Sequence, residues 1–361
     1  MLAKHLLRFF PPPRYLRLES LGIDLSDRSI KYCLVERVKN RFKLGQIGER
    51  ELPSGALVGG QIRDLPAVQG VLRELGKITG RRLAMVALPE EPSYIIRLTL
   101  PALAPAELRS SIELQLEEHV PLPPAGLVFD YEILRAPDAA RAEYDLVVSV
   151  FPAPLATLYR DLFVGAGWQP LAFELEAQAI GRAVGPAGAT VAVADFGRLH
   201  LGLSVVADGQ VLRTSTIGEI SGDLLSRSLA RSLGGSEAEA EATKSASGVL
   251  ETSDSRVLFA ILPAVSVLRD EIKRFISSWG ELDGQRTGGA TAISRLLLVG
   301  GGAFLPGLVE YLANGLPVPV AVGNVWQHLV GERSAVPPIE APVASRYATA
   351  IGLGLRAHLP R

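Results

Sequence analysis

Apolar residues recur with two different periods in the first part of the chain. Alternation is clearest at Ile30, Tyr32 and Leu34, and the residues between them are also fairly apolar. A strand that is apolar on both faces is typical of the centre of a covered sheet. The pattern predicts strands at 20–25, 29–36 and 41–51. A helical period at 66–79 and a short apolar run at 83–88 then predict a helix and a buried strand, which together make an α/β unit.

A block with a different order of elements follows at residues 93–151. It reads as strand, helix, strand and strand, at 94–100, 105–120, 126–134 and 143–151. Apolar residues in the helix return every four positions, which places them on one helix face. Because the α/β pattern resumes at 154–165, 170–173 and 176–184, we predict that this βαββ block is a small inserted subdomain.

A second set of strands begins at residue 189 and repeats the order of the first. Asp208 and Gly209 separate two apolar runs, and this dipeptide is a strong signal for a β-hairpin. Residues 20–51 and 189–217 therefore each contain a strand, a polar turn and two further strands. This duplication predicts an α/β protein with two lobes.

The remaining pattern completes the second lobe. Ser236 and Glu239 form a capping box at a helix start, a long helix is predicted at 256–278, and a loop at 284–291. Further elements are predicted at 223–233, 294–299, 306–313 and 344–357. The predicted division is an arm at 1–17, lobe I at 18–92 and 152–188, the inserted subdomain at 93–151, lobe II at 189–338 with a helical subdomain near 234–290, and a C-terminal helix at 339–361. A hinge or linker is expected at 185–188, where the sequence is Gly-Pro-Ala-Gly.

Charge and composition exclude several classes of protein. The chain of 361 residues has 37 Lys and Arg against 38 Asp and Glu, and a formal charge of -1, so general nucleic-acid binding is disfavoured. Its single cysteine, Cys33, excludes an intrachain disulfide and a Cys-rich zinc site. We therefore expect a reducing, cytoplasmic setting. No apolar run approaches the roughly 20 residues of a membrane span, and residues 1–10 read as a short amphipathic or disordered arm before three prolines.

Three polar turns follow apolar strands and are the candidate functional segments. The first contains Asp24, Ser26 and Ser29 with Lys31, the second contains Asp195 and Gly197, and the third is the triple glycine 300–302. Small residues after a strand expose backbone N–H groups that can surround phosphates. Two aspartates at equivalent strand ends could orient a hydrated Mg2+ between the lobes. Singly, each turn is more often structural, but their occurrence in two repeated lobes favours a nucleotide site.

Other well-known site patterns do not fit. Gly76-Lys77 lacks the glycine spacing and the hydroxyl residue of a phosphate-binding loop, and Leu305 stands where a dinucleotide fingerprint needs its third glycine. Ser221 lies outside the spacing of a nucleophile elbow. The five histidines have no metal-ligand spacing.

Six segments resemble the PilM family of type IV pilus assembly proteins, within the actin-like ATPase superfamily and similar to FtsA. They extend over nearly the whole chain from about residue 18 onward. The segments are LGIDLSDRSIKYCLVE (21–36), LPALAPAELRSSIELQLEEHVPLP (100–123), AGWQPLAFELEAQAI (166–180), SGDLLSRSLARSLGGSEAEAEATK (221–244), LLLVGGGAFLPGLVEYL (296–312) and YATAIGLGLR (347–356).

The resemblance implies a two-lobed fold with ATP and Mg2+ between the lobes and no catalytic residue. Asp24 and Asp195 would hold Mg2+ through water. The implied nucleotide-binding residues are Asp24, Ser26, Ser29, Lys31, Asp195, Gly197, Gly222, Glu241, Lys244, Gly300, Gly301 and Gly302. Glu241 and Lys244 would lie near the ribose, and the triple glycine would lie against the adenosine.

The resemblance also implies partners. The cytoplasmic N-terminal tail of PilN, an inner-membrane protein, would occupy a groove between lobe I and the inserted subdomain. Motor ATPases, a platform protein and a homo-oligomer or ring are further implied contacts, with the protein peripheral at the inner membrane. Neither nucleic acid nor a membrane span of its own is expected.

The chain departs from the family pattern at both phosphate turns. Asp27 and Arg28 replace small residues in the first turn, and Arg198, Leu199 and His200 do so in the second. An arginine directed at a phosphate would strengthen binding, whereas one lying across the turn would block it, and the sequence leaves both readings open. At Val325 a proline is commonly found in the family.

Three alternatives to an ATP-binding scaffold are considered. A small-molecule kinase of the same superfamily needs a carboxylate that accepts a hydroxyl proton, and the inserted block has no Asp-rich motif of that kind. An FtsA-like filament former is expected to end in an amphipathic membrane helix, whereas this chain stops at Leu359-Pro360-Arg361. A GspL-like type II secretion component is expected to continue into a transmembrane helix.

Overall fold

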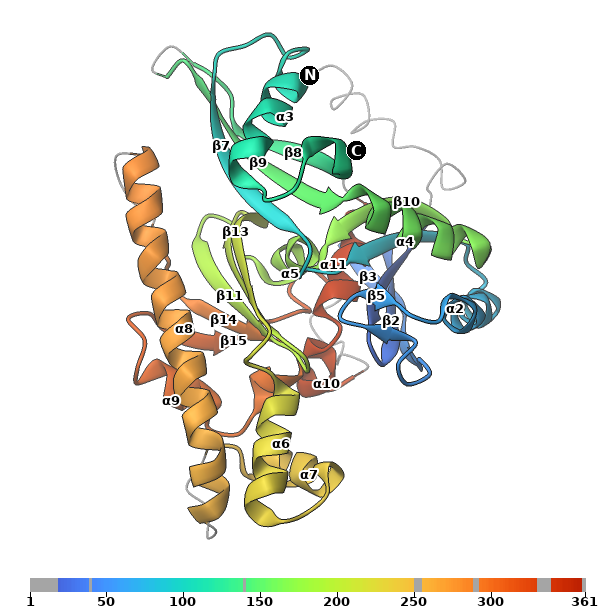
Figure 1. Ribbon diagram of the computed structural model, residues 1–361, viewed down its shortest axis with the longest axis vertical. Coiled ribbons are helices and arrows are strands. Elements are labelled where there is room, and N and C mark those ends of the chain that lie inside the picture. The colour runs from blue at the N-terminus through green and yellow to red at the C-terminus, as the bar shows by residue number, and fades with distance from the viewer. Residues whose placement is uncertain are drawn as a thin grey trace.

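Two five-stranded sheets form the two halves of the computed structural model (Figure 1). The structure describes residues 19–38, 41–138, 141–249, 255–287, 292–329 and 339–358. The predicted N-terminal arm lies outside these described residues, as do residues 330–338 and the last three residues.

The first sheet has the strand order β10-β6-β1-β2-β3. Strands β1 and β2 are antiparallel, as are β2 and β3, while β6 and β10 run parallel to β1. Most residues of β1, β2 and β6 are buried, as the sequence predicts for strands that are apolar on both faces. The strand bounds are Leu21–Ser26 for β1, Ser29–Val38 for β2, Arg41–Glu51 for β3, Leu83–Leu88 for β6 and Gln169–Leu175 for β10.

The second sheet repeats this topology, with the order β13-β12-β11-β14-β15. Its first three strands form an antiparallel meander, and β14 and β15 run parallel to β11. The duplicated two-lobed α/β architecture is therefore confirmed. The bounds are Thr190–Phe196 for β11, Leu201–Ala207 for β12, Gln210–Ile217 for β13, Leu296–Val299 for β14 and Val320–Val322 for β15.

The inserted block folds as a three-stranded sheet with one helix. The strands are β7 (Tyr94–Pro101), β8 (Leu127–Arg135) and β9 (Glu143–Pro152), in the order β7-β9-β8. Helix α3 (Leu108–His119) buries Leu108, Ile112 and Leu116 against this sheet, as its four-residue apolar period predicts.

Helices cover the outer faces of both main sheets. In the first lobe these are α2 (Leu65–Thr79) and α4 (Ala153–Gly165), and α2 begins with Asp64 accepting a hydrogen bond from the Ala67 N–H. In the second lobe, α8 (Ser255–Thr287) and α9 (Leu308–Ala313) pack against the sheet, whereas α6 (Gly222–Leu233) and α7 (Glu237–Ser247) pack on each other and on α8, beyond the ends of the strands (Figure 1). The predicted capping box of Ser236 and Glu239 is present at the start of α7.

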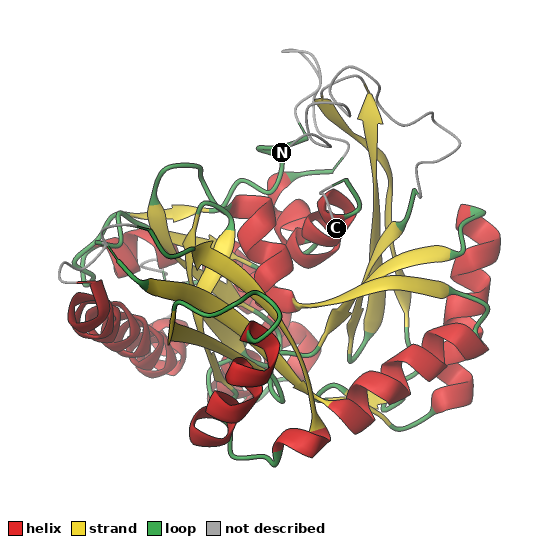
Figure 2. Cartoon of the chain, turned by 90° about the horizontal axis from the view of Figure 1, so that it is seen from above, coloured by secondary structure: helices red, strands yellow, loops and turns green. Residues whose placement is uncertain are grey.

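Two helices lie between the two sheets and join the lobes (Figures 1 and 2). They are α5 (Glu176–Val184) and α11 (Ala348–Arg356), and their apolar residues share one core with β2, β11 and β14. The helices approach so closely that a Cβ atom at Gly352 would overlap the backbone carbonyl of Ala179. In the segment 185–188 that follows α5, Gly185 is buried beside Val206, and the Gly188 N–H donates to Asp208.

Four details differ from the elements predicted by the sequence. Helix α8 continues through Thr287, so the prediction of a loop from residue 284 is wrong. The single helix predicted at 344–357 is two helices, α10 (Ala341–Ser345) and α11. The short strands β4 (Leu57–Val58), β5 (Gln61–Ile62) and β15 were not predicted. Two short 3-10 helices were also not predicted. They are η2 (Pro124–Gly126) and η3 (Gly301–Phe304), and η3 begins directly after Gly300. None of the described helices is long and apolar enough to cross a membrane.

Candidate functional site

The first polar turn joins β1 to β2 and is tied together by side chains. Asp24 is 7% exposed, and the Lys31 Nζ lies 3.9 Å from its Oδ2 atom. Lys31 also donates to the Ser26 Oγ at 3.3 Å, and Ser29 donates to Glu49 Oε1 at 2.5 Å. The structure thus brings all four predicted residues of this turn together, with a buried ammonium group placed between a carboxylate and a hydroxyl.

Asp27 and Arg28, the two unusual residues of this turn, point away from its small residues. Both carboxylate oxygens of Asp27 accept from the Gly59 N–H at 3.0 Å, in the hairpin between β4 and β5. Arg28 extends to Asp223 in the second lobe, where its Nη2 lies 3.8 Å from Oδ2. Neither the Asp27 nor the Arg28 side chain forms a hydrogen bond or an ion pair with Ser26 or Ser29.

The second polar turn joins β11 to β12 and lies across from the first. Asp195 is held beside Gly300, where φ is 84° and a Cβ atom would collide with the Asp195 carboxylate and the Phe196 backbone. The Gly197 N–H donates to the His200 carbonyl at 3.1 Å, and the Gly197 carbonyl accepts from the Gly222 N–H at 3.1 Å. Because the N–H groups of Gly197 and Gly222 are used in this way, a phosphate at this turn would need other donors.

Helices α6 and α7 bring the remaining predicted polar residues together. The Lys244 Nζ donates to Glu241 at 2.7 Å, to the Ser226 Oγ at 2.9 Å and to the Gly222 carbonyl at 3.1 Å. Ser226 in turn donates to Glu241. The predicted group Gly222, Glu241 and Lys244 is therefore a connected cluster, with Ser226 as a member that the sequence did not indicate.

The triple glycine lies beside the C-terminal helices. A Cβ at Gly301 would meet only the Arg346 Cγ, at 3.8 Å, whereas one at Gly302 would overlap the Phe196 ring. Arg346 donates to both Glu49 oxygens at 3.1 and 3.2 Å. Glu49, which also accepts from Ser29, therefore links the first polar turn to Arg346, the side chain that lies beside Gly301.

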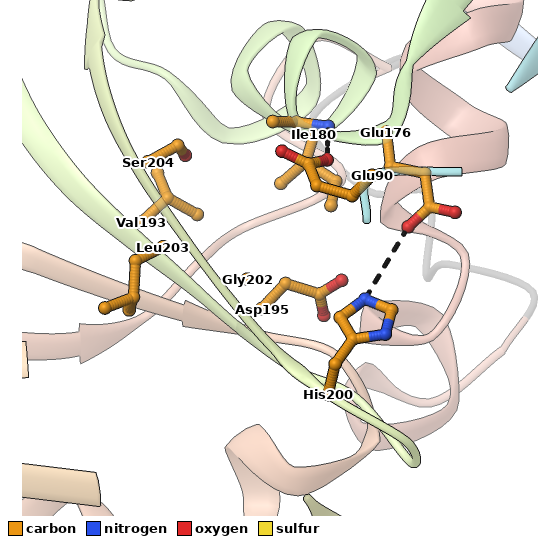
Figure 3. Close-up of a pocket in the computed structure, with 10 residues that line it drawn as sticks. Glu90, Glu176, Ile180, Val193, Asp195, His200, Gly202, Leu203 and Ser204 are labelled. Carbon is orange, nitrogen blue, oxygen red and sulfur yellow. Dashed lines mark hydrogen bonds and ion pairs between the residues drawn. The ribbon is translucent and has the colours of Figure 1, made fainter. Parts of the chain in front are cut away.

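Two carboxylates that the sequence analysis missed face the same region. Glu90 follows β6, and Glu176 follows β10 as the first residue of α5. Both line a small cavity, partly open to solvent, that also includes Asp195 and His200 (Figure 3). The His200 Nε2 lies 3.9 Å from Glu176 Oε2, and Glu90 accepts from the Ala177 N–H at 2.9 Å.

The strand-end argument that selected Asp24 and Asp195 would have found both residues. Strands β1, β6 and β10 are parallel, so their carboxyl ends meet at one edge of the sheet. Glu90 and Glu176 are the acidic residues just beyond two of those ends.

Burial raises the pKa values of these carboxyl groups. The pKa of Glu90 is raised to about 7 by burial and by the charge of Asp195, against a lowering effect of the Ala177 N–H. Burial also raises the pKa values of Asp24, Asp195 and Glu176, with the neighbouring carboxylates adding to the effect and Lys31 opposing it. A cation bound here would lower all four pKa values, because it favours the charged forms.

The carboxylates fit a hydrated metal better than an enclosed one. In the described parts of the chain, no group of three or more His, Cys, Asp and Glu side chains could hold a metal ion. Mg2+ commonly keeps several waters and is bound through one or two carboxylates and the phosphates of a nucleotide. Asp24 and Asp195 are suited to that arrangement.

Two sheets of the same topology, two helices between them and polar turns that face each other define an actin-like fold. A family model described as type IV pilus assembly protein PilM matches residues 22–358. The chain belongs to this family, as the resemblance predicted.

Solved structures show the same fold at low sequence identity. A structure titled as a PilM-PilN type IV pilus biogenesis complex has a TM-score of 0.78 and 22% identity, covering 95% of this chain and 100% of that one. The ethanolamine utilization protein EutJ of Carboxydothermus hydrogenoformans has a TM-score of 0.55 and 17% identity, covering 96% and 90%. MreB5 of Spiroplasma citri bound to ADP has a TM-score of 0.54 and 12% identity, covering 93% and 95%.

Proposed function

We propose that the protein is an ATP-binding scaffold of the type IV pilus assembly machinery, and that it binds the N-terminal tail of PilN. The family match over residues 22–358 carries this proposal. The similar fold of the chain in a PilM-PilN complex supports the choice of partner.

The junction of lobe I with the inserted subdomain is the proposed peptide groove. Strand β8 is an edge strand of the inserted sheet, and α4 follows directly after β9. Val128 on β8 is 45% exposed and Leu158 on α4 is 36% exposed. An edge strand with apolar side chains beside it suits an extended peptide, which can add main-chain hydrogen bonds to the sheet.

The partner proposal predicts that a charge in this groove weakens peptide binding. A fluorescent peptide with the sequence of the PilN tail from the same gene neighbourhood would be titrated with purified protein. We expect Val128→Glu and Leu158→Glu each to weaken binding at least tenfold, which is about 1.4 kcal/mol. Val267→Glu on α8, where Val267 is 50% exposed, is the control and should bind normally. Absence of binding by the unmodified protein would refute the proposal.

The nucleotide part of the proposal rests on the two polar turns. Lys31 supplies a buried positive charge, and Asp24 and Asp195 would hold hydrated Mg2+. At Gly301, where a Cβ would meet only the Arg346 Cγ, a ligand could approach the backbone closely. The similar fold of MreB5 in a complex with ADP supports this placement. When bound, Mg2+ would neutralise phosphate charge, while Ser26, Ser29 and the Gly222 cluster would position the nucleotide.

The two aspartates are predicted to be essential for this binding. Isothermal titration with Mg-ATP should show binding by the unmodified protein and none by Asp24→Ala or Asp195→Ala, because either change leaves the metal without one of its two carboxylates. Asp208→Ala, in the turn between β12 and β13, is the control. Equal affinity of all four proteins would contradict the assignment.

The wider setting follows from the same proposal. Binding to the PilN tail would hold the protein at the cytoplasmic side of the inner membrane. Contacts with pilus motor ATPases and a platform protein, and assembly into a homo-oligomer or ring, are part of the proposed scaffold role.

A further inference from the structure

One carboxylate in the second lobe pairs with an arginine from each polar turn. The Arg198 Nε lies 2.8 Å from Asp223 Oδ1, and the Arg28 Nη2 lies 3.8 Å from Asp223 Oδ2. Arg28 belongs to the first lobe, whereas Arg198 and Asp223 belong to the second. The contact between Arg28 and Asp223 is therefore an ion pair between the lobes.

Asp223 is the fixed member of this group. It lies in the first turn of α6, where Ser221 caps the helix and the Asp223 N–H donates to the Arg198 carbonyl at 3.0 Å. Its side chain is 18% exposed, while those of Arg198 and Arg28 are 51% and 60% exposed. The two arginines can therefore turn to another anion while the carboxylate stays in place.

A nucleotide polyphosphate is the anion that this position would meet. Both arginines lie in the turns proposed to surround the phosphates, and a guanidinium group binds phosphate with paired hydrogen bonds. A polyphosphate carries more charge than one carboxylate, so it would compete successfully for the same donors. Asp223 would then compete with the ligand for the same two guanidinium groups.

We propose that Asp223 is an internal competitor of the nucleotide phosphates, which holds Arg28 and Arg198 between the lobes until a polyphosphate displaces it. This inference rests on the proposed nucleotide site. It assigns phosphate recognition to two arginines that replace the small residues of the family pattern. It also makes the pair between Arg28 and Asp223 a contact that nucleotide binding breaks.

The test is a comparison of ATP, ADP and adenosine binding by isothermal titration, in the presence of Mg2+. We expect Asp223→Asn to raise the affinity for ATP about two- to fivefold, the range of a partly exposed ion pair. Arg28→Gln and Arg198→Gln should each lower it. Adenosine, which has no phosphate, should bind all of these proteins equally. Glu237→Gln removes an exposed charge in the first turn of α7 and is the control for a general effect of charge.

The results separate this inference from the nucleotide site on which it rests. Unchanged or weaker ATP binding by Asp223→Asn, with normal adenosine binding, would overturn the competitor role and leave the site in place. Binding of ATP by Asp223→Asn but not by the unmodified protein would support the inference in its strongest form. Failure of both proteins to bind ATP would overturn the inference and the nucleotide site together. Thermal unfolding of each variant checks that it is folded. Arg28→Gln removes the exposed partner of the ion pair between Arg28 and Asp223, and so it tests the same contact without changing Asp223.

Discussion

Glu90 is a buried carboxyl group whose surroundings favour its neutral form. Its pKa of about 7 lies well above the ordinary value of 4.5. Between these values the folded protein binds more protons at this group than the unfolded chain does. The free energy of unfolding therefore decreases as the pH rises from about 4.5 to 7, because Glu90 becomes charged in its buried position. Above pH 7 this loss of stability has reached its full size.

Glu90→Gln is predicted to stabilise the protein at neutral and alkaline pH. Glutamine keeps an acceptor for the Ala177 N–H without a charge, so the variant should gain about 2–3 kcal/mol at pH 8 and nothing near pH 4.5. Urea unfolding at several pH values measures this difference. The neighbouring Glu91 is exposed, and Glu91→Gln should leave the pH dependence unchanged. A constant offset between Glu90→Gln and the unmodified protein would contradict the prediction.

The sequence could identify some site residues and not others. Asp24 and Asp195 were found because each stands at the end of an apolar strand, and the same argument extends to Glu90 and Glu176. Asp223 gave no such signal, because its importance depends on where Arg28 and Arg198 point. The direction of a long side chain is set by its spatial neighbours, and sequence spacing does not contain them.

At the scale of elements, the contact between α5 and α11 depends on the absence of a side chain. Gly352→Ala should lower the free energy of unfolding by about 3 kcal/mol, because the new methyl group would press the two helix backbones apart. Gly70→Ala is the matched control. Gly70 is exposed in α2, and a Cβ there would meet nothing within 4 Å, so this change should stabilise the protein by about 0.5–1 kcal/mol. Thermal or urea unfolding measures both, and an equal effect of the two changes would count against this account of the contact.

Long periodic elements were predicted well, and short or broken ones were not. The apolar period placed α2, α3 and the strands of both meanders, since each buries a regular set of residues. Strand β15 has only three residues, which is too short for alternation to be recognised. The break between α10 and α11, at Arg346 and Tyr347, contains no proline or glycine that would have predicted it. Arg346 at this break pairs with Glu49, and these two residues are far apart in the chain.

At the scale of the whole molecule, the inserted sheet contacts lobe II as well as lobe I. Val147 and Val148 are neighbours on the central strand β9, but they face opposite sides. Val147 packs in the core of lobe II, and Val148 packs under α3. Near the same junction, Gln210 donates to Glu132 of β8 at 2.9 Å, and β7 lies against β13. The inserted sheet is therefore a third support of the arrangement of the lobes.

Changing these two neighbours should loosen different parts of the protein. Val147→Ala and Val148→Ala each remove about two buried methyl groups and should cost about 2 kcal/mol. Hydrogen exchange should rise at β13 in the first variant and at α3 in the second. The same exchange pattern in both variants would show that the inserted sheet does not couple to lobe II in this way.

The seating of α11 against β1 determines the order in which the protein can be completed during synthesis. A Cβ at Gly22 in β1 would overlap the backbone of α11, so this early strand is shaped to receive a helix that is synthesised after all the strands of the second lobe. Until then, one face of the first sheet has no cover. The nascent first lobe therefore exposes apolar surface throughout translation of the second, and this surface is buried only after both lobes have been synthesised.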